Sequence, residues 1–278
     1  MNRTVGLFVL MTMGMFLFAA TLCAQAAKKE TRTIVFAGSG SGVAIVRVLA
    51  KEFERRNPGI RVEVPPSIGT GGGIKAAAAG SISAGMATRP LKPEEKALGL
   101  SHLPFAATAQ ALAVHPSVPE DGITTAELIA IYRGKKTQWQ NGRKIIVLTR
   151  EPGDSSMDII RNALPGFSDA YLESIEKRDW YVLYSDQIMN QTLASTRDAI
   201  GLTDLGEVAA ERFPVKPLRL NGVAPTLDNV KKGTYPLVKN LAFVYRDDLL
   251  SPDARRFIDF VKSKEGARIL LRTNYLPR

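Results

Sequence analysis

Three short turns carry the residue types that bind small anions. Residues 38–42 read Gly-Ser-Gly-Ser-Gly, residues 69–73 read Gly-Thr-Gly-Gly-Gly, and residues 150–156 read Arg-Glu-Pro-Gly-Asp-Ser-Ser. Glycine lets the backbone approach a ligand closely, while serine and threonine hydroxyls add hydrogen-bond donors. The guanidinium of Arg150 adds a full charge in a fork that fits a tetrahedral oxyanion. Together, the three turns indicate a site for a small oxyanion.

Each turn is predicted to connect a strand to a helix. Short apolar strand patterns at residues 33–36, 60–64 and 144–148 run into the turns, and apolar residues at helical spacing follow them. Such turns direct unpaired backbone N–H groups and positive helix ends at one point. In parallel sheets they meet at the carboxyl ends of the strands, where ligands bind. One such turn often only caps its helix, so the prediction rests on all three.

The rest of the chain repeats the alternation of strands and helices. Further strand patterns lie at residues 106–114, 200–203 and 241–245, and further helical patterns lie at residues 124–132, 157–164, 185–194, 251–261 and 265–271. This alternation predicts an α/β fold with a parallel sheet. The length of 278 residues allows two lobes, which need not be contiguous in sequence.

The N-terminus has the features of a secretory signal peptide. Arg3 is the only charge in the first 27 residues, an apolar run spans residues 5–22, and Ala24-Gln25-Ala26 follows. We therefore expect residues 1–26 to be a signal peptide that sends the protein to a bacterial periplasm. An uncleaved membrane anchor is the alternative, because the apolar run is long.

Composition and failed motifs exclude several classes of function. The formal charge is +10, but there is no basic run of five and no interleaving of aromatic and basic residues, so we expect no nucleic-acid partner. One Cys and two His exclude a disulfide framework and argue against a zinc site or a Cys-His catalytic pair. The P-loop, G-x-G-x-x-G and G-x-S-x-G patterns are not met. We expect no enzyme, no catalytic residue, no metal and no cofactor.

The order of the motifs resembles the substrate-binding proteins of phosphate ABC importers, which have the type II periplasmic binding protein fold. The resemblance runs over nearly the whole chain after the signal peptide. It is anchored at residues 38–42, 68–73, 85–91, 131–135, 150–156, 199–201, 225–230 and 233–237. Each anchor is weak alone, and their order makes them specific.

The resemblance implies two lobes joined by two crossovers, with the ligand between them. Lobe 1 would comprise residues 27–112 and 241–278, and lobe 2 residues 113–240. The implied ligand contacts are Ser39, Gly40 and Ser41 from the first turn, Thr70 and Gly71 from the second, and Arg150, Ser155 and Ser156 from the third. Arg89 and Asp154 are further candidates; Arg89 could equally lie on the surface. The implied function is to capture inorganic phosphate and deliver it to the permease of an ABC importer, and we expect the protein to be a monomer.

Two departures from the family pattern bear on the ligand. In well-known phosphate binders an Asp after the second turn accepts the proton of hydrogen phosphate, whereas residues 87–90 here read Ala-Thr-Arg-Pro. Pro152 also replaces the Asp that would orient the arginine of the third turn. Asp154 is a candidate for either role, or for the cap of the next helix. Sulfate, molybdate and tungstate therefore remain alternative ligands, and an exported anion sensor remains an alternative function.

Overall fold

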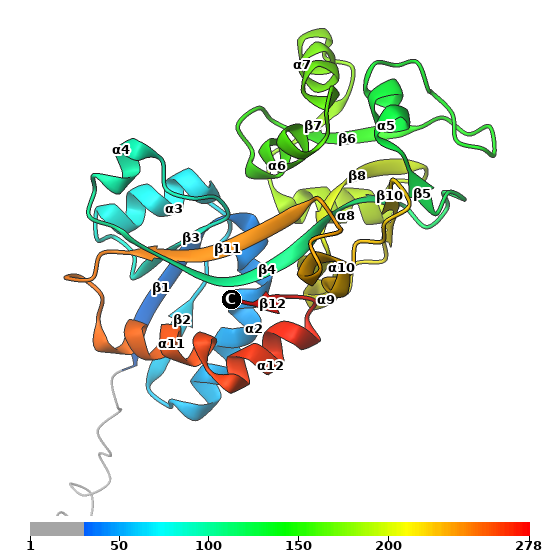
Figure 1. Cartoon of the computed structure of the whole chain (residues 1–278). Coiled ribbons are helices and arrows are strands. Elements are labelled where there is room, and N and C mark those ends of the chain that lie inside the picture. Colours follow the sequence, from blue (N-terminus) through cyan, green and yellow to red (C-terminus); the bar gives the residue numbers. More distant parts are fainter. Residues whose placement is uncertain (1–30) are drawn as a thin grey trace, which may run out of the picture. The chain divides into compact units, whose positions relative to one another are not determined.

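Strands and helices alternate through residues 31–278, the part of the chain that this computed structural model describes (Figure 1). The predicted signal peptide, residues 1–26, lies outside the described residues. The strands are β1 (Arg32–Gly38), β2 (Ile60–Glu63), β3 (Ala84–Ala87), β4 (Ser101–Val114), β5 (Gly122–Ile123), β6 (Ile146–Arg150), β7 (Tyr181–Leu183), β8 (Ala199–Asp204), β9 (Lys216–Pro217), β10 (Arg219–Leu220), β11 (Val238–Tyr245) and β12 (Leu276–Pro277).

The predicted helices are present, and four more appear. The helices are α2 (Gly40–Arg56), α3 (Gly69–Ala78), α4 (Pro93–Lys96), α5 (Thr125–Tyr132), α6 (Ser155–Ala163), α7 (Phe167–Lys177), α8 (Asp186–Ser195), α9 (Leu205–Glu211), α10 (Leu227–Lys231), α11 (Pro252–Lys262) and α12 (Lys264–Arg272). The extent of the first two glycine turns is corrected, because residues 40–42 and 69–73 already belong to α2 and α3. Within residues 31–278, none of the helices has both the length and the hydropathy needed to cross a membrane.

The main sheet is mixed rather than purely parallel. Its order is β2-β1-β3-β11-β4-β8-β6-β7, with β9 and β12 also paired to β4. Strand β1 is parallel to β3, and β6 is parallel to β7 and β8. In the middle, β11 is antiparallel to β3 and β4, and β4 is antiparallel to β8. The parallel prediction thus holds at the two ends, and the two long central strands depart from it.

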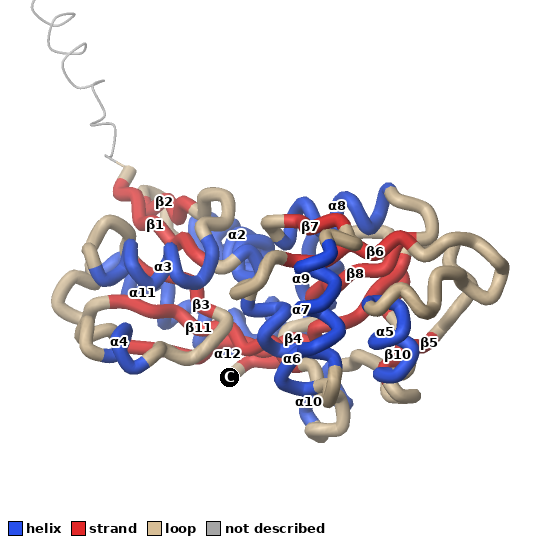
Figure 2. Tube along the Cα trace, turned by 90° about the horizontal axis from the view of Figure 1, so that it is seen from above, coloured by secondary structure: helices blue, strands red, loops and turns tan. Residues whose placement is uncertain are grey.

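Two hydrophobic cores lie along this sheet. The first draws on residues 34–106 and 241–275, and Phe36 contacts Phe257 within it with ring centroids 4.9 Å apart. The second draws on residues 109–237. Figure 2 shows α3 and α11 around β1 and β3, and α5 and α7 beside β6 and β8. Because β4 and β11 pass from one core to the other, the fold has two lobes with two crossovers; the exact lobe boundaries stay a prediction.

Gly73→Ala is expected to destabilise the fold, whereas Gly71→Ala is not. A Cβ at Gly73 would lie 2.7 Å from the Cα of Gly38 and 2.9 Å from the carbonyl oxygen of Ala37. Because both are backbone atoms, Gly73→Ala should lower the free energy of unfolding by about 1–3 kcal/mol. A Cβ at Gly71 meets no atom within 4 Å, so this variant should gain about 0.5–1 kcal/mol of helix propensity. Urea denaturation measures both; equal stabilities would contradict the close packing of α3 on β1.

Candidate functional site

The three predicted turns meet at one cavity of about 510 Å³. Eight of the ten predicted ligand-binding residues line it: Ser39, Gly40, Thr70, Gly71, Arg89, Arg150, Asp154 and Ser155. The other two, Ser41 and Ser156, are buried and are not among the lining residues. The carboxyl ends of β1 and β6 and the starts of α2, α3 and α6 therefore supply most of the cavity wall.

A threonine that the sequence analysis missed links all three turns. Thr88, directly after β3, is 5% exposed. Its Oγ1 lies 3.3 Å from Ser39 Oγ, 3.0 Å from Thr70 Oγ1 and 2.8 Å from Ser155 Oγ. Strands β1 and β3 are parallel neighbours, so their carboxyl ends lie side by side. Thr88 follows the end of β3 as the first turn follows the end of β1. The hydroxyls of four residues thus form one hydrogen-bonded group at the cavity.

Two of the helices that start at the cavity are not capped by the side chain of their N-cap residue. Neither Ser39 at the start of α2 nor Ile68 at the start of α3 makes a side-chain cap hydrogen bond, and in α3 only the N–H of Gly69 donates to a nearby hydroxyl, Ser67 Oγ, at 3.2 Å. Helix α6 differs, because Asp154 accepts a hydrogen bond of 2.9 Å from the backbone N–H of Ser156. Uncapped first-turn N–H groups and the positive helix end attract an anion. The starts of α2 and α3 are therefore suited to holding an oxyanion.

Arg150 lies buried at the cavity wall between carboxylates. It donates from Nη2 to Asp154 at 2.7 Å and from Nη1 to Asp186 at 3.0 Å. Glu151 Oε2 lies 3.8 Å from Nε, which has no hydrogen-bond partner within residues 31–278. Burial lowers the pKa of Arg150, but the nearby carboxylates outweigh burial and hold the pKa above its ordinary value. Asp154 thus orients the arginine and also caps α6.

Arg89 lies at the cavity but is already paired. Its guanidinium donates to both carboxylate oxygens of Glu95, at 2.6 and 2.7 Å. The hydrogen bond from Arg89 is the main reason that the pKa of Glu95 falls to about 2. Both predicted cations are thus paired with carboxylates, and they differ in exposure: the side chain of Arg89 is 24% exposed and that of Arg150 is 4% exposed. Because water and salt screen a buried charge less, Arg150 is the stronger of the two for an anion.

A buried lysine that the sequence analysis also missed lies behind the cavity wall. Lys239, in β11, is 1% exposed and donates to Ser41 Oγ at 2.9 Å and to Ser156 Oγ at 2.6 Å. Its Nζ also lies 3.1 Å from Asp204 Oδ2. The two predicted serines that do not line the cavity are therefore held by Lys239. The sequence signal was a lysine in β11, where Asn240 is followed by the apolar run Leu-Ala-Phe-Val.

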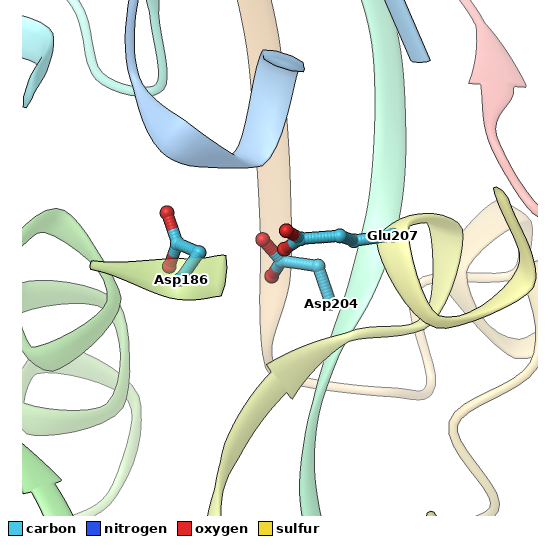
Figure 3. A group of neighbouring side chains, drawn as sticks. All are labelled: Asp186, Asp204 and Glu207. Atoms are coloured by element: carbon cyan, nitrogen blue, oxygen red, sulfur yellow. The ribbon is translucent and has the colours of Figure 1, made fainter. Parts of the chain in front are cut away.

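Three carboxylates cluster beside this lysine (Figure 3). The oxygens of Asp186, Asp204 and Glu207 lie within 4.8 Å of one another, and Asp204 and Glu207 are buried. Burial, reinforced by Asp186 and Asp204, raises the pKa of Glu207 well above its ordinary value. Burial likewise raises the pKa of Asp204. Carboxylate oxygens are the ligands that hard cations prefer. Here the positive charge of Lys239 already offsets part of the negative charge of the cluster.

The free energy of unfolding is expected to fall between about pH 5 and pH 8, partly because of Glu207. An unfolded Glu ionises near about pH 4.3, whereas folded Glu207 keeps its proton to higher pH because it is buried. The stabilisation that this proton gives is therefore fully present below the pKa of the unfolded Glu, and it is lost as pH rises through the higher pKa of folded Glu207. Urea denaturation across this range should show a flatter pH dependence for Glu207→Gln. Glu211→Gln, exposed in the same helix, is the control and should keep the wild-type slope.

Comparisons with known proteins give a consistent result. Residues 24–265 match a family model described as a PBP superfamily domain. Protein SphX of Synechococcus elongatus is 30% identical, over 87% of this chain and 77% of SphX. Phosphate-binding protein PstS of Bacillus subtilis is 24% identical, over 98% of this chain and 93% of PstS.

Solved structures show the same fold. A phosphate ABC transporter substrate-binding protein from Clostridium perfringens, solved with bound phosphate, is 26% identical with a TM-score of 0.78, over 89% of this chain and 100% of that one. An ABC-type phosphate transport receptor from Vibrio cholerae is 24% identical, with a TM-score of 0.63, over 87% of this chain and 99% of that one. The likeness therefore extends over most of both cores.

Proposed function

The chain belongs to the PBP superfamily, and we propose that it captures inorganic phosphate in its cavity and delivers it to an ABC importer. The observation that carries this proposal is the meeting of three anion-binding turns and Arg150 at one polar cavity. The similar Clostridium perfringens protein, whose structure holds phosphate, supports the choice of ligand. We propose lobe boundaries at residues 112 and 240; the crossover strands pass between the cores nearby, between residues 106 and 109 and between residues 237 and 241.

We assign the ligand contacts to groups from both lobes. Lobe 1 would provide the hydroxyls of Ser39 and Thr70 and the N–H groups at the starts of α2 and α3. Lobe 2 would provide Ser155 and the guanidinium of Arg150. A ligand held from both sides binds the closed form better than the open form, so it shifts the population toward the closed form. A membrane permease could then recognise that closed form.

The charges at the cavity favour an oxyanion that can carry a proton. Cationic and acidic side chains both line it: Arg89, Lys92 and Arg150, against Glu151, Asp154, Asp158 and Asp186. Because Arg89 is also neutralised by Glu95, a fully ionised dianion meets an excess of carboxylates. Hydrogen phosphate can donate its proton to a carboxylate, whereas sulfate cannot. These carboxylates offset the absence of an acid in residues 87–90.

We propose an exported periplasmic monomer without catalytic activity. The hydroxyls of Ser39, Thr70 and Ser155 are all hydrogen-bonded to Thr88, and no histidine is among the residues that line the described cavity. In hydrolases with a serine or threonine nucleophile, a histidine is the commonest base that activates the hydroxyl. Binding rather than turnover is therefore the function that the arrangement supports.

Isothermal titration of the purified protein tests the proposal. Phosphate should bind at one site per chain, at least about 100-fold more tightly than sulfate, molybdate, tungstate or nitrate. At a hundredfold excess over its dissociation constant, phosphate should add about 2.7 kcal/mol to the free energy of unfolding. Absence of heat with every anion would contradict oxyanion capture, and a preference for sulfate or molybdate would replace phosphate as the ligand. Unchanged phosphate uptake in cells that lack the protein would favour the sensor alternative.

A further inference from the structure

The carboxylate of Asp186 joins the two sides of the cavity directly. This residue begins α8 in lobe 2, and its Oδ1 accepts a 3.0 Å hydrogen bond from Arg150 Nη1. Its Oδ2 accepts a 3.4 Å hydrogen bond from Ser41 Oγ in α2 of lobe 1. A Cβ added at Gly40 would collide with the same Oδ2, so the carboxylate lies against the backbone at the start of α2. Asp186 therefore contacts both lobes.

The two partners of Asp186 are also the ones that an oxyanion needs. The start of α2 has no side-chain cap, and Arg150 is a buried full positive charge at the cavity wall. A carboxylate presents two oxygens that share one negative charge, as part of a phosphate does. The carboxylate of Asp186 thus makes the same two contacts, with Arg150 and with the start of α2, that we propose for the ligand.

The other charged neighbours of Asp186 act in opposite directions. Asp204 and Glu207 place carboxylate oxygens within 4.8 Å of an oxygen of Asp186, and Figure 3 shows these two side chains on one side of Asp186. The carboxylate of Asp204 repels Asp186 when both are ionised, whereas the ammonium of Lys239, 3.1 Å from Asp204, attracts both. Arg150 is the cation that donates directly to Asp186. If a ligand engages Arg150, Asp186 loses that donor and its repulsion by Asp204 is less well offset.

We propose that Asp186 is an internal competitor of the ligand. It bridges Arg150 and the start of α2 while the cavity is empty, and an oxyanion must displace it from that bridge. The competition lowers the affinity for every oxyanion and draws the lobes together before binding. This inference rests on the proposed function, because it requires that an oxyanion binds at Arg150.

Asp186→Asn tests the competition by calorimetric titration with inorganic phosphate and with sulfate. Asparagine keeps the shape of the side chain and removes its charge, so both anions should bind about tenfold more tightly than to the wild type. Asp169→Asn is the matched control, since it removes an exposed aspartate from the first turn of α7 in the same lobe. This control should change either affinity by less than about twofold.

Small-angle scattering gives a second readout that does not require ligand binding. Without phosphate, Asp186→Asn should have a larger radius of gyration than the wild type, because the interlobe bridge is lost. Weaker or unchanged anion binding by Asp186→Asn would overturn the competition, and an unchanged radius would overturn the bridging. If the wild type itself binds no phosphate, the proposed function fails, whereas tight wild-type binding that Asp186→Asn does not improve defeats this inference alone. If Asp186→Asn does not fold, Ser41→Ala removes the other end of the bridge and should also enlarge the unliganded protein.

Discussion

Arg150→Ala is expected to weaken phosphate binding by at least about tenfold. The variant removes the guanidinium, and it leaves the carboxylates of Asp154 and Asp186 beside the incoming anion. Arg150→Lys should recover only part of the loss, because an ammonium keeps the charge without the fork. Calorimetric titration of the three proteins with phosphate measures the effect. Wild-type affinity in Arg150→Ala would contradict the central assignment of this site.

The same substitution is expected to lower stability, and this effect must be separated from binding. Removing one partner of a buried ion pair costs about 3–5 kcal/mol, because the other charges stay buried without compensation. Arg150 is 4% exposed and has two carboxylate partners. Titrations should therefore be made well below the midpoint of thermal unfolding. Arg89→Ala is a useful comparison, because Arg89 forms a partly exposed ion pair with Glu95. This variant should lower the affinity for phosphate by no more than about threefold.

Local sequence chemistry predicted the turns, because the features of an anion-binding turn are local. Glycine, hydroxyl residues and a strand-to-helix junction occur within a few residues of one another. Eight of the ten predicted residues line the cavity for this reason. Ser41 and Ser156 do not, because a buried lysine far along the chain holds their hydroxyls. Nothing within the turns indicated that partner.

The missed residues share a different cause. Thr88 follows β3, whose sequence Ala-Gly-Met-Ala has no alternation, because all four residues are buried between neighbouring strands. Asp186 and Lys239 act across distances of 145 and 198 residues from Ser41. Such contacts follow from the paths of β4 and β11 between the lobes, which also make the sheet mixed rather than parallel. The positions of Thr88, Asp186 and Lys239 depend on how the strands are arranged in space, and the hydrophobic periodicity of the sequence does not predict that arrangement.

Lys239→Met is expected to destabilise the protein by about 3–5 kcal/mol and to weaken phosphate binding as well. The buried Asp204 would lose its ion-pair partner, and the hydroxyls of Ser41 and Ser156 would lose the donor that positions them. Burial already raises the pKa of Asp204, and without the lysine this carboxyl should hold its proton to still higher pH. The protonated Asp204 adds to the free energy of unfolding. This stabilisation is fully present below about pH 3.9, the pKa of an unfolded Asp, and it is lost as pH rises through the higher pKa of folded Asp204. Urea denaturation should therefore show a larger defect in Lys239→Met at about pH 8 than at about pH 5.

The double variant Lys239→Met/Asp204→Asn separates the lost charge pair from the lost packing. If the unpaired Asp204 carboxylate causes the defect, replacing it with a neutral amide should restore part of the stability at about pH 8 and remove the added pH dependence. Phosphate binding should stay weak in the double variant, because no group replaces the ammonium that holds Ser41 and Ser156. A double variant with the stability of the single one would show that the ion pair is not the source of the defect. Recovery of stability without recovery of binding would identify Lys239 as a positioning residue that acts through the two serines.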